Sequence, residues 1–171
     1  MPITLVRIDD RLVHGQIVQG WLKNIAVDKI VVASDIVAED SLQQMLMAMA
    51  VPAGVELEIK NVADAIKAVL AKEYDAVKTM ILASNPGDVL KMIESGAPFK
   101  SVNVGGMHFA NGKRQLLCNI SVDDSDIENL YKIYSKGIEI EGRVLPLDDR
   151  TNIIPVIEKE YNLICLLKAD K

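Results

Sequence analysis

The residues best suited to chemistry lie between Arg7 and Gln16, in the stretch Arg-Ile-Asp-Asp-Arg-Leu-Val-His-Gly-Gln. This stretch contains His14, one of only two histidines in the chain, together with two arginines and two aspartates. An imidazole nitrogen can attack phosphorus and hold the phosphoryl group as a phosphoramidate. Such a group carries about two negative charges, so cations and backbone N–H groups stabilise it. The stretch therefore predicts a site that accepts a phosphoryl group.

Neighbouring groups supply the other parts of such a site. Arg11 is the first candidate for dispersing the charge of the phosphoryl oxygens, and Arg7 is the second. The backbone N–H groups of Gly15 and Gln16 are candidates for binding an oxygen, because they would open a helix directly after a strand.

The two aspartates of the stretch are expected to stay ionised beside the arginines. Asp9 and Asp10 can hold these cations in place. Asp10 is also expected to orient the His14 ring, as a carboxylate fixes a histidine tautomer in other proteins. A solvated turn with an aspartate cap is the alternative interpretation.

The elements that must position these groups alternate along the chain. Strands are expected where apolar or β-branched residues run together, over Ile3–Ile8, Lys29–Ser34, Val55–Asn61, Thr79–Ser84, Ser101–Val104, Arg114–Ile120 and Ile138–Val144. Helices are expected where apolar residues recur at helical spacing, over Gly15–Lys23, Ser41–Val51, Val62–Lys72, Pro86–Ser95, Asp124–Ser135 and Asn152–Lys168. This alternation predicts an α/β fold, a three-layer α/β/α sandwich with a mainly parallel sheet, and one domain over residues 1–171.

Ligands of such sheets bind at the carboxyl ends of the strands, and His14 directly follows the first strand. Further candidates for the same edge follow the second, fourth and fifth strands. They are Ser34, Asp35, Ser84, Gly105, Gly106 and His108. Turn chemistry alone accounts for Asp35, and the glycine pair could bring the backbone close to a phosphate.

Composition excludes several other functions. The chain of 171 residues is half hydrophobic and a quarter charged, with a net charge of −5. No basic stripe supports nucleic-acid binding, and no segment has the features of a signal peptide or a membrane span. Cys118 and Cys165 fit no metal or redox spacing, so we expect buried free thiols in a reducing cytoplasm.

Methionines gather in the helix expected over 41–51. Its apolar stripe is formed by Leu42, Met45, Leu46 and Met49. We interpret the methionine cluster of Met45, Met47 and Met49 as core packing, and a docking face is the alternative.

The stretch Arg7–Gln16 resembles the active-site signature of the IIB component of the bacterial phosphotransferase system, in the mannose/fructose/sorbose class. The similarity extends along almost the whole chain and includes Ile30–Asp35 and Val102–Met107. It implies a three-layer fold in which six strands run in the order 3-2-4-1-5-6, with an additional edge strand.

The resemblance also implies a phosphoryl relay. A phosphohistidine on a IIA partner would pass its phosphoryl group to His14, and His14 would pass it to a sugar held by the membrane components IIC and IID. Arg11 matches the transition-state arginine of the family, and the accepting atom of the family is Nδ1. No metal, nucleotide or other cofactor is expected.

Such a protein would act in the cytoplasm at the inner face of the membrane, bound through IIC and IID, with a homodimer compatible with the resemblance. Two large partners must reach His14 in turn, so we expect it on an exposed rim with shallow apolar surface around it. The sugar is set chiefly by the membrane components.

Two other functions are weighed against the relay. Val13-His14-Gly15 is similar to the Arg-His-Gly of histidine phosphatases, with His108 as a second histidine, but Val13 stands where a phosphate-binding arginine is required. A non-catalytic module that binds a small anion is the other alternative. Stable phosphorylation of His14 without release of phosphate would argue against both.

Overall fold

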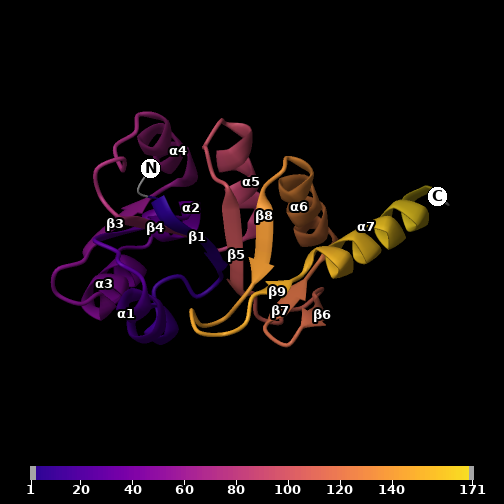
Figure 1. Cartoon of the computed structure of the whole chain (residues 1–171), viewed down its shortest axis with the longest axis horizontal. Helices are drawn as coiled ribbons and strands as arrows, with labels where there is room; N and C mark the ends of the chain where they lie inside the picture. Colours follow the sequence, from indigo (N-terminus) through magenta and orange to yellow (C-terminus); the bar gives the residue numbers. More distant parts are fainter. Residues whose placement is uncertain (1–2, 170–171) are drawn as a thin grey trace.

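The chain is built around one seven-stranded sheet in this computed structural model, which describes residues 3–169 (Figure 1). The strands are β1 (Ile3–Asp9), β2 (Lys29–Ala33), β3 (Glu56–Lys60), β4 (Thr79–Ala83), β5 (Ser101–Gly106), β8 (Glu139–Gly142) and β9 (Thr151–Asn152). Their order is β3-β2-β4-β1-β5-β8-β9, and all neighbours pair in parallel except β9, which runs antiparallel to β8. The α/β class and the mainly parallel sheet are thus confirmed.

The core order 3-2-4-1-5 is confirmed as well, and the order differs in detail beyond β5. The segment expected as one strand over 114–120 is a hairpin of β6 (Arg114–Leu117) and β7 (Ile120–Val122), which forms a separate two-stranded sheet and touches the main sheet through a bridge between Ile120 and Met107. The turn at Cys118 and Asn119 divides the segment, since asparagine favours turns. Cys118 and Cys165 are both exposed, so the expectation of buried thiols is wrong. The next strand in the main sheet is therefore β8, and β9 adds a two-residue edge.

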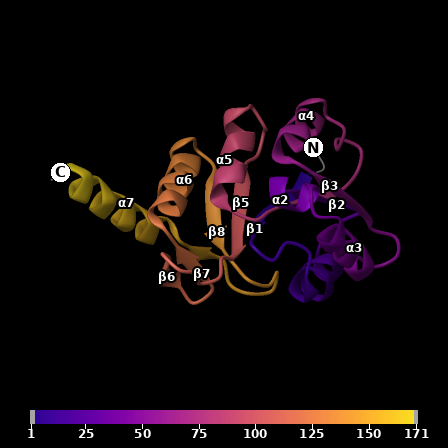
Figure 2. The same ribbon diagram turned by 180° about the vertical axis from the view of Figure 1, so that it is seen from behind.

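Helices cover the two faces of the sheet unequally (Figures 1 and 2). One face carries α4 (Val62–Leu70), α5 (Pro86–Glu94), α6 (Asp124–Ser135) and the start of α7 (Ile154–Ala169). The other face carries η1 (Gln16–Trp21), a short π-helix, with α1 (Leu22–Asn24), α2 (Asp35–Ala38) and α3 (Ser41–Ala50). No helix within residues 3–169 is long and apolar enough to cross a bilayer.

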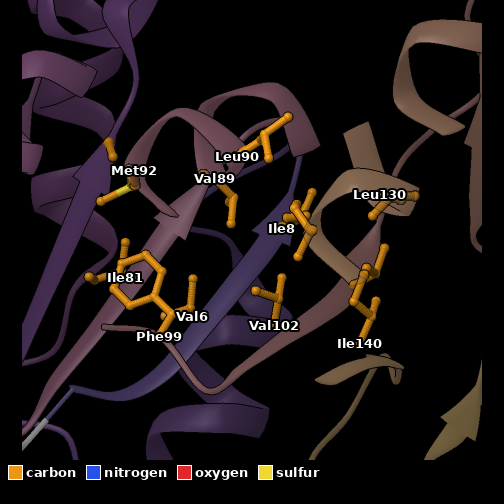
Figure 3. Close-up of a cluster of buried hydrophobic side chains, with 14 of the residues drawn as sticks. Val6, Ile8, Ile81, Val89, Leu90, Met92, Phe99, Val102, Leu130 and Ile140 are labelled. Atoms are coloured by element: carbon orange, nitrogen blue, oxygen red, sulfur yellow. The ribbon is translucent and has the colours of Figure 1, made fainter. Parts of the chain in front are cut away.

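Apolar side chains fill the space on both sides of the central strands. Val6 and Ile8 of β1 point toward α5 and α6, where they join Ile81 and Val102 of the neighbouring strands (Figure 3). On β2, Val31 lies on this side, whereas Ile30 and Val32 belong to the opposite cluster. Continuous β-branched runs are typical of strands buried on both faces, and the structure confirms that interpretation.

Local chemistry at the helix ends also agrees with the sequence. Pro86 occupies the first turn of α5, and the Asn85 side chain accepts a hydrogen bond from Asp88 N–H. After α6 and α5 the chain passes through glycines with positive φ, +80° at Gly137 and +101° at Gly96. Glycine adopts this left-handed conformation without steric cost, so it ends both helices.

The methionine-rich helix α3 contradicts the core interpretation. Met45 and Met49 are 55% and 77% exposed, and only Met47 of the three methionines is buried. The Gln44 side chain donates to the carbonyls of Val37 and Ala38. These two hydrogen bonds hold α3 with Met47 pointing toward the sheet. The opposite stripe therefore faces solvent, and it consists of Leu42, Met45, Leu46 and Met49.

The stability of α3 should depend on Met47 and not on Met49. We predict that Met47→Ala lowers the free energy of unfolding by about 2–3 kcal/mol, because it leaves a cavity among buried side chains. Met49→Ala should change it by less than about 0.5 kcal/mol, as for other exposed positions. Urea unfolding of both variants measures the difference, and equal losses would contradict the placement of α3.

Candidate functional site

The candidate site is the loop that joins β1 to η1 at the carboxyl edge of the sheet. Packing fixes its conformation, because the side chains of Leu12 and Val13 are both buried in the apolar cluster between η1 and the sheet. Leu12 has a φ of +54°, which is rare for a branched side chain, and its N–H donates to the Asp9 carbonyl. Strained residues persist where surrounding packing fixes them, so the loop has one anchored conformation.

His14 is bound at both ring nitrogens. Its Nε2 lies 3.1 Å from Asp9 Oδ2, and its Nδ1 accepts a hydrogen bond of 3.3 Å from the backbone N–H of Gln16. A carboxylate only accepts, so Nε2 carries the proton and Nδ1 carries the lone pair. The ring is 14% exposed, and the Nδ1 lone pair faces the backbone N–H of Gln16, the first residue of η1.

The Asp9 carboxylate is fully buried and is shared with a second partner, Arg7. Arg7 Nη2 lies 2.8 Å from the same Oδ2 atom, and this guanidinium is also fully buried. Burial alone would raise the pKa of Asp9. The hydrogen bond from His14 and the charge of Arg7 outweigh it and hold the pKa of Asp9 below its ordinary value.

Arg7 is enclosed on all sides. Its Nη1 donates to Asn103 Oδ1 at 2.5 Å and to the Arg143 carbonyl at 2.9 Å. Its guanidinium lies 5.0 Å from the centre of the Trp21 ring, and that of Arg143 lies at the same distance from that ring. The expectation that Arg7 disperses phosphoryl charge therefore needs correction. A cation with no exposed surface cannot contact an incoming phosphoryl group, and it acts through Asp9.

The glycine pair at the end of β5 makes room for this buried ion pair. A Cβ atom on Gly105 would lie 1.8 Å from Arg7 Cζ, and one on Gly106 would lie 3.2 Å from Asp9 Oδ1. The strand pairing explains this closeness, since Arg7 of β1 lies opposite Asn103 of β5. Gly105 is thus required by the packing of Arg7, which the sequence did not reveal.

Arg11 lies at the surface beside His14, where the sequence placed it. Its Nη2 donates to Gln16 Oε1 at 2.6 Å, and its Nε lies 3.7 Å from Asp9 Oδ1. The side chain is 42% exposed. Arg11 and Gln16 line a hollow of about 350 Å³ together with residues of the β5–β6 loop and the hairpin, among them Gly106, His108, Phe109 and Asn119. This hollow gives an anionic group open access to a cation.

Asp10 does not orient His14, contrary to expectation. Its carboxylate binds His108 instead, with Oδ1 2.7 Å from Nδ1 and Oδ2 accepting from the backbone N–H at 2.6 Å. Asp9 is the last residue of β1, and its side chain lies on the face that carries η1. Asp10 follows the strand, and its carboxylate reaches the β5–β6 loop. Its N–H donates to the carbonyl of Gly106, the last residue of β5. Asp9, and not Asp10, therefore orients the His14 ring.

The remaining polar candidates lie at the carboxyl edge but serve neighbouring elements. Ser34 Oγ accepts from Val37 N–H and begins α2, and Asp35 Oδ1 accepts from Val62 N–H at the start of α4. Ser84 Oγ accepts from the Asn85 side chain. Ser34 and Asp35 thus bind the first turns of helices, and Ser84 binds the side chain of the residue that caps α5.

Three residues that support the site were missed by the sequence reasoning. Asn103 interrupts the apolar run of β5, and a polar residue inside a buried strand was an available signal. Trp21 was assigned only to the apolar stripe of its helix. Arg143 left no local signal, because its contact with Arg7 joins positions 136 residues apart.

The burial of Asp9 makes the stability of the site dependent on pH. We predict that Asp9→Asn lowers the free energy of unfolding at pH 7 by about 3–5 kcal/mol, because Arg7 stays buried without its counter-ion. The pKa of Asp9 is depressed, so its contribution is fully present above its ordinary pKa and is lost as pH falls through the folded value.

Denaturant unfolding of wild type and Asp9→Asn between pH 7 and pH 3 measures this contribution. The gap between the two proteins should be constant at neutral pH and should shrink as the solution becomes more acidic than about pH 4. A gap that is independent of pH would show that the Asp9 carboxylate does not stabilise the fold through its charge.

Comparison with known proteins gives a consistent result. The family model of the PTS system sorbose subfamily IIB component matches residues 3–164. The fructose-specific EIIB component of Bacillus subtilis (strain 168) is 39% identical over 157 residues, which cover 92% of this chain and 96% of that protein. The crystal structure of the IIBSor domain of the sorbose permease from Klebsiella pneumoniae has a TM-score of 0.87 at 33% identity, covering 93% of this chain and 98% of that one.

A longer relative matches over part of its length. The mannose-specific EIIAB component of Escherichia coli (strain K12) is 40% identical over 159 residues, which cover 93% of this chain and 49% of that protein. The chain thus spans about half the length of this relative.

Proposed function

The chain belongs to the sorbose subfamily of the IIB components of the phosphotransferase system, and from this premise we propose that His14 is its phosphoryl carrier. A member of this family is a phosphoryl-relay subunit of a sugar-transporting system and a transferase. The observation that supports His14 is its pair of contacts. Asp9 accepts from Nε2, and the Nδ1 lone pair is left at the start of η1.

In this proposal Nδ1 is the accepting atom. The Nδ1 lone pair attacks the phosphorus of a phosphohistidine on the partner, so that one P–N bond forms as the other breaks. No proton has to leave Nδ1, because the hydrogen bond to Asp9 keeps the proton on Nε2. Bond formation places positive charge on the ring, and the neighbouring Asp9 carboxylate offsets it.

Arg11 and the backbone of Gln16 receive the phosphoryl oxygens. Gln16 N–H points at Nδ1, so it is positioned to donate to an oxygen once Nδ1 is bonded to phosphorus. The Arg11 guanidinium is exposed on the same side and is held by Gln16 Oε1. Both groups are thus in place to stabilise the dianion and the charge that develops during transfer. Gly15 leaves open space beside them.

The second transfer goes to a sugar hydroxyl. The P–N bond to His14 breaks, a P–O bond forms, and the hydroxyl proton passes to water or to a base of the component that binds the sugar. The relatives are named for fructose, mannose and sorbose, so the sugar is left open. We place the sugar on the membrane components IIC and IID, and the donor phosphohistidine on a IIA protein or domain.

The surroundings of His14 suit contact with large partners. Phe109 is 72% exposed and lines the open hollow beside Arg11. A partner that enters this hollow can therefore contact an apolar ring next to the Arg11 cation. We propose that residues 1–171 act as one IIB domain at the inner face of the membrane. The homodimer stays a prediction.

The two alternative functions are not supported. Val13 is buried in the core under η1, where it cannot bind a phosphate, and the ring of His108 binds Asp10. The position directly before His14 thus lacks the arginine that a histidine phosphatase would have there, and the family of the chain is not one of passive anion-binding modules.

We predict that phosphorylation takes place on His14. Incubation with phosphoenolpyruvate, the general phosphotransferase proteins and a matching IIA should add one acid-labile phosphoryl group to the wild type and none to His14→Ala. Intact mass spectrometry measures the change, and circular dichroism checks that the variant is folded. Phosphorylation retained in His14→Ala would place the acceptor elsewhere.

Arg11 should contribute to the rate and not to the fold. We predict that Arg11→Ala slows phosphoryl transfer from phospho-IIA by about 10³-fold, the lower range for an arginine that stabilises a phosphoryl transition state. Arg150→Ala is the matched control, because Arg150 is an exposed arginine that pairs with Glu139 and Glu141. Rapid-quench kinetics measures both, and equal rates for the two variants would remove Arg11 from the mechanism.

A further inference from the structure

The second histidine of the chain is tied to the phosphorylation loop. His108 lies in the β5–β6 loop, and both oxygens of the Asp10 carboxylate bind it, one at the ring Nδ1 and the other at the backbone N–H. A third hydrogen bond runs from Asp10 N–H to the Gly106 carbonyl at 3.0 Å. Two of these three bonds join Asp10 and His108, which lie 98 positions apart in the sequence.

Stability alone does not explain this attachment. The side chains of His108 and Asp10 are 56% and 34% exposed, and exposed ion pairs contribute little to folding because water screens them. Both hydrogen bonds are nevertheless short, at 2.6 and 2.7 Å, and each oxygen of the carboxylate binds one of the two His108 nitrogens. The contact fixes where the Asp10 charge lies.

The location of that charge matters for a phosphoryl acceptor. Asp10 is the immediate neighbour of Arg11 in the sequence, and His108 and Arg11 line the same hollow. A free carboxylate there would repel the incoming phosphoryl group and compete for the Arg11 guanidinium. It could also compete with Asp9 for the His14 ring, which would move the proton from Nε2 and remove the Nδ1 lone pair.

We propose that His108 is a positioning residue for phosphoryl transfer, which binds the Asp10 carboxylate through its ring and its backbone N–H and so keeps it away from His14 and Arg11. The inference rests on the proposed role of His14. His108 acts through Asp10 and forms no covalent bond with phosphorus. A neutral or absent Asp10 charge would make His108 dispensable.

Three variants test this role. His108→Ala leaves the Asp10 carboxylate without its ring partner, and should slow transfer from phospho-IIA by on the order of tenfold. His108→Asn keeps an N–H donor near the Nδ1 position and should retain most of the rate. The double variant with Asp10→Asn and His108→Ala has no carboxylate at position 10 for His108 to hold. Its rate should therefore equal that of Asp10→Asn alone.

Salt gives a second measurement that a purely structural role would not change. Repulsion between exposed charges weakens as ionic strength rises. The ratio of the wild-type rate to the His108→Ala rate should therefore fall as the salt concentration rises. The ratio of the Asp10→Asn rate to the rate of the double variant should stay near one at every salt concentration. Thermal unfolding of each variant monitors the fold.

Two results would overturn the inference. One is a His108→Ala rate equal to that of the wild type, and the other is a loss that persists in the double variant. Failure of the proposed function would look different, because phosphorylation would then survive in His14→Ala. If the wild type is phosphorylated on His14 and the two rates are equal, only the role of His108 is lost.

Discussion

The site depends on one buried carboxylate. Asp9 Oδ2 binds both Arg7 and His14, and neither the carboxylate nor the guanidinium reaches solvent. A buried charge is tolerated only when it is paired and hydrogen-bonded, so the surrounding structure must complete the bonds of both groups. Asn103 and the Arg143 carbonyl both accept from Nη1 of Arg7, and His14 binds Asp9. The orientation of His14 therefore follows from a requirement of folding.

The sheet meets this requirement because its two faces carry different side chains around β1 and β5. Toward α5 and α6, β1 and β5 present only apolar side chains, whereas on the other face they present Arg7 and Asn103 as a cross-strand pair. The loop after β8 covers Arg7 from this side. The Trp21 ring centre lies 5.0 Å from the guanidinium groups of Arg7 and Arg143, and its Nε1–H donates to the Val144 carbonyl. The reactive loop is thus supported by long-range contacts and can remain exposed at its tip.

Much of this arrangement could be predicted from the sequence, because periodicity and turn chemistry are local. The alternation of strands and helices, the position of His14 after β1, and the end of α6 near Gly137 all follow from such patterns. The choice between Asp9 and Asp10 did not, since adjacent residues point in different directions and only the path of the loop decides. The exposed stripe of α3 was also missed, because an apolar pattern shows that a face needs a partner and does not show which one.

The central claim is that Asp9 holds His14 in the tautomer with the proton on Nε2, which leaves Nδ1 free to accept phosphorus. Long-range ¹H–¹⁵N correlation NMR of the histidine rings in the unphosphorylated protein, at a pH where His14 is neutral, reads this tautomer directly. We predict a protonated Nε2 and an unprotonated Nδ1 for His14, assigned by comparison with His14→Ala. A proton on Nδ1 of His14 would contradict the account, because the accepting nitrogen would then be blocked and Asp9 would not determine the reactive state.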